Sequence, residues 1–265
     1  MGQGYGKQNN ITEMKLPYSI RIYASSLLGA AVVIAICYKV WFNHVCESII
    51  KDYPEQNYIA HGGGAIDGHI ATNSLEAIDN AIAHGFRYIE LDLQLTADSF
   101  LVATHDWDSF IEITGFKNYD NLPPTLEEFK NCRIWGKYTP LTYCMIDSIF
   151  FRHPELILVT DKLDDAYYLQ KFLPGLTHKT MVECFTRNKF DEIKKTGAFI
   201  PMSSYPNIVP GQMNVTSSES TRYRRFRFMP SAYALFRIGI TTRQEADSVF
   251  ASDRRVRFYY VDIVE

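Results

Sequence analysis

Two carboxylates interrupt an apolar, β-prone stretch, "RYIELDLQL", that begins at Arg87. Glu90 and Asp92 are two residues apart, so on a strand both side chains leave the same face. A second apolar run follows and ends in the pair His105-Asp106. Unpaired carboxylates on a strand suited to burial are costly, and a divalent cation between them removes that cost. An imidazole nearby can move protons at neutral pH, so these residue types indicate metal-assisted acid/base chemistry.

Ionisable residues also occur at or near the ends of other apolar runs. His61 ends "YIAH" and is followed by three glycines, which open the backbone around it and make a core role improbable. Asp161 ends "ELILVTD", Lys162 follows it, and Glu183 lies within "TMVECF". We interpret Lys162 and Glu183 as substrate contacts, with a solvated or ion-paired lysine as the alternative for Lys162. Oxygen ligands of this kind suit Mg²⁺ or Ca²⁺ better than zinc.

The composition is that of an ordinary globular protein and gives no reason to expect a nucleic-acid partner. The 265 residues are 46% hydrophobic and 22% charged, and the formal net charge is -3 at pH 7. The basic cluster "RYRRFRF", residues 222–228, is short. It is either a contact to anionic lipid or phosphate or the solvated face of an ordinary segment. Five cysteines show no C-x-x-C spacing, so neither a zinc site nor a redox motif is expected.

The clearest regional signal is an uncharged apolar run at residues 22–38. Extended to Phe42, it approaches the roughly 20 residues that a helix needs to cross a bilayer. Tyr38 and Trp41 suit a membrane–water interface. A cleaved signal peptide and a buried core helix are the alternatives, but no A-x-A-like cleavage site follows the run. We therefore predict a retained transmembrane anchor.

The anchor divides the chain into four predicted parts. They are a cytoplasmic N-terminal segment (1–21), the transmembrane anchor (22–42), a short tether (43–56) and a catalytic domain (57–265). Basic residues are more frequent before the apolar run than after it. That bias favours a catalytic domain on the outer side, in the periplasm or the extracellular space.

From residue 57 onward, short apolar runs alternate with segments of helical pattern. Such alternation predicts parallel βαβ units, and their number fits a (β/α)₈ barrel of the TIM type. A helix is expected in "NSLEAIDNAIAHG", beginning at Asn73, which would cap it together with Glu76. A doubly wound open sheet is the alternative, but "HGGGAIDGHIATNS" does not supply the required G-x-G-x-x-G loop.

A barrel of this type gathers its functional residues at the carboxyl ends of its strands. We expect residues 88–95 to form one strand and "LVATHD", residues 101–106, to form the next. The ionisable residues at this end of successive strands are then His61, Glu90, Asp92, His105, Asp106 and Asp161.

The set "AHGG…TNSLEA…IELDLQLT…VATHD" resembles the glycerophosphodiester phosphodiesterases, a family of phospholipase-C-like phosphodiesterase barrels. Their pattern runs H-R-G, E-N-T-x-E-A, E-x-D and H-D at similar intervals. The resemblance implies that His61 and His105 are the acid/base pair and that Glu90 and Asp92 are metal ligands. A third carboxylate ligand is expected on "LILVTD", where Asp161 is the only candidate.

Three positions depart from the family pattern. Gly62 replaces an arginine that usually contacts the phosphate, and Thr72 replaces a glutamate before Asn73. Asp161 and Lys162 are adjacent where the family has one residue between carboxylate and lysine. Side-chain alternation would send these two to opposite faces unless the strand bulges or ends there.

These residues predict a membrane-anchored, metal-dependent phosphodiesterase acting on a glycerophosphodiester or a related phosphodiester of lipid headgroups or surface polymers. One histidine would take a proton from the nucleophile and the other would protonate the leaving alkoxide. The nucleophile is either water or a neighbouring substrate hydroxyl, which would give a cyclic phosphate. Two alternatives are an impaired barrel that only binds phosphorylated glycans or lipids, and a lyase-type phospholipase.

Overall fold

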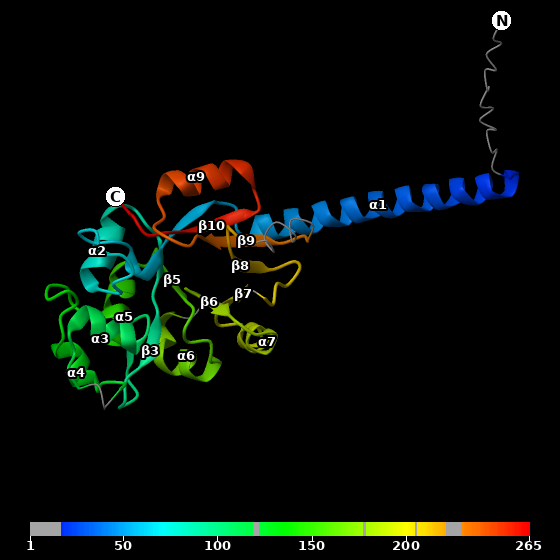
Figure 1. Ribbon diagram of the computed structural model, residues 1–265. Coiled ribbons are helices and arrows are strands. Elements are labelled where there is room, and N and C mark those ends of the chain that lie inside the picture. Colours follow the sequence, from blue (N-terminus) through cyan, green and yellow to red (C-terminus); the bar gives the residue numbers. More distant parts are fainter. Residues whose placement is uncertain (1–16, 119–121, 177–178, 205, 221–228) are drawn as a thin grey trace, which may run out of the picture. The chain divides into compact units, whose positions relative to one another are not determined.

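Eight parallel strands close into a barrel in the computed structural model, which describes residues 17–118, 122–176, 179–204, 206–220 and 229–265 (Figure 1). The barrel strands are β1 (Asn57–Ala60), β2 (Tyr88–Glu90), β5 (Ile157–Thr160), β6 (Thr180–Cys184), β7 (Ile200–Ser204), β8 (Met213–Ser217), β9 (Ala232–Phe236) and β10 (Val256–Val261). β1 pairs with both β2 and β10, which closes the sheet. The predicted barrel is confirmed, and the open-sheet alternative is excluded. The basic cluster 222–228 and the first 16 residues lie outside the described residues.

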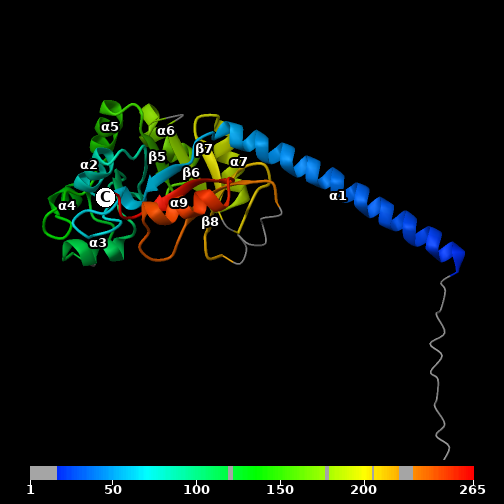
Figure 2. The same ribbon diagram turned by 90° about the horizontal axis from the view of Figure 1, so that it is seen from above.

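The helices of the barrel unit in the described residues are α2 (Leu75–Ala83), α3 (Trp107–Thr114), α4 (Leu126–Asn131), α5 (Tyr143–Arg152), α6 (Ala166–Phe172), α7 (Arg187–Thr196) and α9 (Arg243–Ser252). α3 and α4 lie in the connection between β2 and β5, and the others pack on the outside of the sheet. Two short 3₁₀ turns are η1 (His61–Gly63) and η2 (Pro174–Leu176). Seen from above, α5 and α6 lie at the edge of the barrel, and α9 passes in front of the strands (Figure 2).

The chain divides into two compact units, residues 1–44 and 45–265. The first unit contains most of α1 (Tyr18–Asp52), a 35-residue helix long and apolar enough to cross a membrane. None of its apolar window is buried within the chain, so it is not the buried core helix of the sequence alternatives. The helix continues through most of the predicted tether, 43–56, and its residues from Val45 onward belong to the barrel unit.

Apolar side chains form two layers because successive residues of a strand face opposite sides of the sheet. The inward layer includes Ile59, Val159, Met202 and Phe258. Ile49 and Tyr53 pack against the same layer from the end of α1. The outward layer packs under the helices and includes Ile89, Leu158, Val182 and Tyr259. Burial of both layers fixes which residues reach the interior at the carboxyl end of each strand.

The segment between β2 and β5 differs from the sequence prediction. Residues 88–95 are not one strand, because β2 ends at Glu90 and β3 (Leu93–Leu95) pairs antiparallel with β4 (Leu101–Ala103). The run 101–106 is therefore not a barrel strand, and that prediction is wrong. Val102, Phe110 and Phe129 form a satellite core that joins β4 to α3 and α4, which lie beside this ribbon (Figure 1). A buried ribbon and a buried barrel strand have the same apolar pattern, so sequence could not separate them.

Candidate active site

The carboxyl ends of the barrel strands surround a cavity of about 520 Å³. Inward positions alternate along each strand, so the residues just beyond the inward apolar layer meet in this cavity. Those that line it from β1, β2, β5, β6, β7, β8 and β9 or directly after them are His61, Glu90, Asp161, Glu183, Ser204, Ser217 and Phe236. The structure therefore brings together ionisable residues that are more than 100 positions apart in the sequence.

The three carboxylates expected to bind a metal lie together. One oxygen each from Glu90, Asp92 and Asp161 lies within 4.8 Å of the other two. Burial raises the pKa of Glu90 well above its ordinary value, and the charges of Asp92 and Asp161 add to the effect. Burial and the Asp92 charge raise the pKa of Asp161 to about 6. Oδ1 of Asp161 is buried with no hydrogen-bond partner among the described residues. Crowded carboxylates with an unsatisfied oxygen fit a divalent cation that prefers oxygen ligands.

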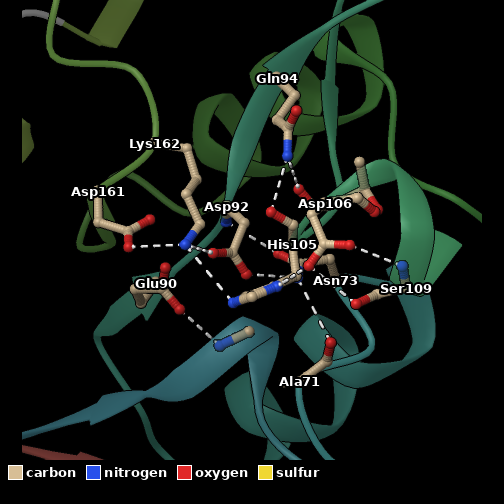
Figure 3. A network of polar contacts seen from close by, with 12 residues as sticks. Ala71, Asn73, Glu90, Asp92, Gln94, His105, Asp106, Ser109, Asp161 and Lys162 are labelled. Carbon is tan, nitrogen blue, oxygen red and sulfur yellow. Dashed lines mark hydrogen bonds and ion pairs between the residues drawn. The ribbon is translucent and has the colours of Figure 1, made fainter. Parts of the chain in front are cut away.

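Lys162 reaches the same cluster although it directly follows Asp161. β5 ends at Thr160 and the chain bends at the next two residues, so strand alternation does not apply there. Nζ of Lys162 lies 3.3 Å from Oδ2 of Asp161 and 3.6 Å from Oδ1 of Asp92 (Figure 3). Burial lowers the pKa of Lys162, but these two carboxylates raise it by more. The missing one-residue gap therefore does not remove the lysine from the site.

His61 directly follows β1 and is held by a carboxylate from the far end of the chain. Its Nδ1 lies 2.9 Å from Oδ1 of Asp262, just after β10. The backbone N–H and the hydroxyl of Thr241 both donate to Oδ2 of Asp262 at 2.8 Å. Burial lowers the pKa of His61, but Asp262 and the other nearby carboxylates raise it above its ordinary value overall. If Nδ1 donates to Asp262, Nε2 is the nitrogen left for a ligand.

His105 has a similar arrangement on the β4–α3 connection. Its Nδ1 lies 2.5 Å from Oδ2 of Asp106, which is also the N-cap of α3. Asp106 accepts from the backbone N–H of Ser109 at 2.7 Å and from its hydroxyl at 2.9 Å. The Ser109 N–H, assisted by His105, lowers the pKa of Asp106 to about 2. Nε2 of His105 lies 3.5 Å from Nζ of Lys162, which connects this histidine to the carboxylates (Figure 3).

Asn73 does not cap α2, contrary to the sequence prediction. The cap is Ser74, whose Oγ accepts from the N–H of Ala77, and Glu76 binds groups outside the helix. Asn73 instead holds Asp92 through two hydrogen bonds. Its Nδ2 donates to Oδ2 of Asp92 at 2.8 Å, and the Asp92 N–H donates to its Oδ1 at 3.0 Å. Asn73 thus orients a carboxylate of the cluster, and a cap motif alone could not indicate this.

Gly62, which stands where the family has an arginine, cannot be replaced by a larger residue without strain. Its φ is +54°, and an added Cβ would collide with the backbone of Ala71. Its N–H donates to Oε2 of Glu90 at 2.7 Å. Thr72, the second departure, is buried with its hydroxyl 2.8 Å from the hydroxyl of the capping serine. Within the described part of the chain, Lys162 is the only lysine or arginine that lines the cavity.

Glu183 lines the cavity from β6 but is not part of the three-carboxylate cluster. It accepts a hydrogen bond from Oγ of Ser204 at 2.5 Å, and its other oxygen lies 3.5 Å from the hydroxyl of Tyr260. Burial raises its pKa to about 7. The sequence reasoning found Glu183 but missed Asp262, although Asp262 also follows an apolar run at a strand end.

Comparisons with known proteins agree with the barrel fold. A family model described as the glycerophosphoryl diester phosphodiesterase family matches residues 61–194. A glycerophosphoryl diester phosphodiesterase from Parabacteroides distasonis has a similar fold, with a TM-score of 0.57 and 16% identity over 79% of this chain and 83% of that one. A phosphodiesterase from Oleispira antarctica, solved in complex with the product sn-glycerol-3-phosphate, also has a TM-score of 0.57, with 14% identity over 78% of this chain and 93% of that one. A search of curated protein sequences finds no significant match.

Proposed function

The chain belongs to the glycerophosphoryl diester phosphodiesterase family and is a phosphoric diester hydrolase, and we propose that it is a membrane-anchored, metal-dependent enzyme with two catalytic histidines. The observation that supports this most directly is the similar placing of His61 and His105. Each has a carboxylate at Nδ1, and each is linked by contact or charge to the cluster of Glu90, Asp92 and Asp161. A carboxylate at Nδ1 fixes the ring and leaves Nε2 to exchange a proton.

The carboxylates of Glu90, Asp92 and Asp161 would hold the metal, Mg²⁺ or Ca²⁺ by the chemistry of their oxygens. When bound, the cation would neutralise charge on the phosphoryl oxygens and polarise the phosphorus for attack. Lys162 provides a second positive charge for a phosphoryl oxygen, in place of the arginine that Gly62 excludes. Gly62 and Asn73 hold two of the carboxylates in position through the hydrogen bonds described above.

Two proton transfers complete the reaction. One imidazole takes the proton of the attacking hydroxyl or water, and the other donates a proton to the departing alkoxide. The paired Asp262 favours a protonated His61, which suits His61 to the donor role. Attack by water gives a phosphomonoester directly, and attack by a neighbouring substrate hydroxyl gives a cyclic phosphate first.

The test is turnover of a glycerophosphodiester by the full-length protein in detergent, with Mg²⁺, Ca²⁺ or Mn²⁺ added. We expect release of a phosphomonoester that stops on addition of a chelator and is restored by excess metal. Phosphorus NMR of the products separates direct hydrolysis from cyclisation. Saturable substrate binding without turnover in any metal would instead support the impaired-barrel alternative.

The anchor is a separate proposal. α1 is long and apolar enough to span a bilayer, and the excess of basic residues before it favours a barrel on the outer side of the membrane. The full-length protein is expected in the membrane fraction of cells, resistant to carbonate extraction. The barrel should be digested by protease added from outside the membrane, whereas a cleaved signal sequence would release a shorter soluble product.

A further inference from the structure

Lys162 is carried into the active site by a short loop and not by a barrel strand. β5 ends at Thr160, and residues 161–165 form neither helix nor strand before α6 begins. Hydrogen bonds of the sheet fix a residue on a strand, whereas Lys162 depends on the contacts that hold its loop. Its Nζ nevertheless lies 3.6 Å from Oδ1 of Asp92 and 3.5 Å from Nε2 of His105. The contacts of the loop therefore decide where this charge is placed.

An ion pair connects this loop to α7. Nζ of Lys189 lies 3.1 Å from Oδ2 of Asp165. The other oxygen of Asp165 accepts from two backbone N–H groups in the first turn of α6, at 3.0 and 3.3 Å, and so caps that helix. Leu163 packs against the apolar layer under the helices. Asp165 thus links the loop to both α6 and α7, three positions after Lys162.

Helix stability does not explain Lys189. It lies in the first turn of α7, where its N–H donates to the hydroxyl of the N-cap Thr186 at 3.2 Å. A cation in the first turn opposes the helix dipole, and α7 has no acidic residue there to offset it. The side chains of Lys189 and Asp165 are 30% and 37% exposed, and such partly exposed ion pairs add little to the stability of a fold. The effect of the pair is therefore to be sought in what it holds in place.

The charges of the loop give Lys189 a second effect on Lys162. The loop sequence "DKLDD" has three aspartates and one lysine. The hydrogen bond from Lys189 lowers the pKa of Asp165, and its charge opposes the rise that burial causes in the pKa of Asp164. Lys189 thus offsets the two aspartates that follow Lys162 in the chain. Without that charge, both aspartates would draw the Lys162 ammonium away from the carboxylates of the cavity.

We propose that Lys189, through its ion pair with Asp165, is a positioning residue that holds Lys162 where a phosphoryl oxygen of the substrate would lie. The inference rests on the proposed function, because that function gives Lys162 its phosphoryl contact. Lys189 is not among the residues that line the cavity, so it acts through the loop and not on the substrate. The link compensates for the missing residue between Asp161 and Lys162, since the loop now provides the placement that a strand would otherwise give.

The first experiment measures turnover of a glycerophosphodiester by the full-length protein. Lys189→Met keeps the apolar stem but removes the charge, and it should lower kcat/KM by roughly tenfold, as expected when a reacting group loses its support. Lys189→Arg should restore most of the activity. Lys195→Met, on the exposed face of α7, is the matched control and should retain full activity. The melting temperature of Lys189→Met should fall by at most about 4 °C, which separates positioning from folding.

A double variant tests whether Lys189 acts through Lys162. In a Lys162→Met background, adding Lys189→Met should cause no further loss of kcat/KM, because the group that it positions is gone. If diesters are cleaved and the two losses multiply, or if Lys189→Met alone keeps full activity, the inference is overturned and the proposed function stands. Should Lys189→Met not fold, Lys189→Gln replaces it, and the same outcomes decide.

A last measurement does not depend on turnover. Calorimetric titration with inorganic phosphate in the presence of Mg²⁺ should show binding that Lys162→Met and Lys189→Met weaken by similar factors and that Lys195→Met preserves. If no diester is cleaved but this pattern is found, the proposed function fails and the positioning role stands. If no diester is cleaved and wild type and Lys189→Met bind phosphate equally, or neither binds it, both the function and the inference fail.

Discussion

The two halves of the barrel mouth differ in charge. The half built from β1, β2, β5 and β6 presents a histidine and several carboxylates together with Lys162, whereas β7, β8 and β9 present Ser204, Ser217 and Phe236. The family model matches residues 61–194, which end within α7 and so cover the first half only. The charged half therefore contains the residues proposed above for metal binding, together with His61. The neutral half forms the opposite wall of the cavity and lies outside the match.

The strongest test of this division removes His61, the proposed proton donor, from the charged half. His61→Ala should lower kcat/KM by roughly 100- to 10,000-fold, the usual contribution of a general acid or base. The measurement is steady-state turnover of a glycerophosphodiester. His84→Ala, an exposed histidine after α2, is the control and should retain full activity. Equal losses in both variants would mean that the charged half has no special role.

A second prediction concerns the backbone that supports the carboxylates. Gly62→Ala should lower the free energy of unfolding by about 2–4 kcal/mol, because the added Cβ meets the backbone of Ala71 at a positive φ. Denaturant unfolding measures this loss. Gly136→Ala, at φ +67° with open space around it, is the control and should cost less because only the backbone strain remains. Similar losses at both positions would show that the close approach to Ala71 is not important.

Asp262 links the two halves of the barrel mouth, because it follows β10 yet pairs with His61, which follows β1. Asp262→Asn should lower kcat by roughly 10- to 100-fold, as expected for a group that orients a reacting side chain. KM should change much less, because Asp262 itself does not line the cavity. The pKa of His61, measured by NMR titration, should fall in the variant. An unchanged His61 pKa would show that Asp262 does not influence the protonation of the histidine.

The same pair predicts a pH dependence of stability. The pKa of His61 is raised above 6.5 in the folded protein, so its stabilisation is complete below pH 6.5 and is lost as pH rises through the raised value. The pKa of Asp262 is lowered below 3.8, so its stabilisation is complete above that pH and is lost as pH falls through the lowered value. The stability difference between wild type and Asp262→Asn should therefore be greater at about pH 5 than at about pH 9. A constant difference contradicts the pairing.

The smallest effect is expected in the neutral half. Ser217→Ala removes one hydroxyl from the cavity wall and its hydrogen bond to Glu219. KM should rise by at most roughly fivefold, since one exposed polar contact contributes about 0.5–1 kcal/mol. A loss of kcat comparable to that of His61→Ala would show that residues of the neutral half also contribute to the chemical step.

The sequence predicted the barrel well because its strands are short apolar runs separated by helices with clear caps. β8 was not predicted, because "MNVTS" mixes polar and apolar residues and looks like a connection. The break between β2 and β3 was also missed, since an apolar pattern does not show which partner a strand pairs with.

The site was predictable where a polar residue interrupts or ends an apolar run, as at Glu90 and Asp161. Asn73 was assigned to a helix cap because its side chain suits that position, and only the fold shows its two bonds to Asp92. Asp262 is 201 positions from His61, and local spacing does not report such a contact. A search for ionisable residues directly after each apolar run, applied to "VRFYYVDI", would have identified Asp262 as a candidate.

The most direct test of the proposed metal centre is calorimetric titration of the full-length protein with Mg²⁺ and Ca²⁺. One saturable site per chain is expected for at least one of these ions. Asp161→Asn should abolish that binding, whereas Asp191→Asn, on the surface of α7, should preserve it. Absence of saturable binding, or equal binding by the wild type and Asp161→Asn, would contradict a metal centre formed by these three carboxylates.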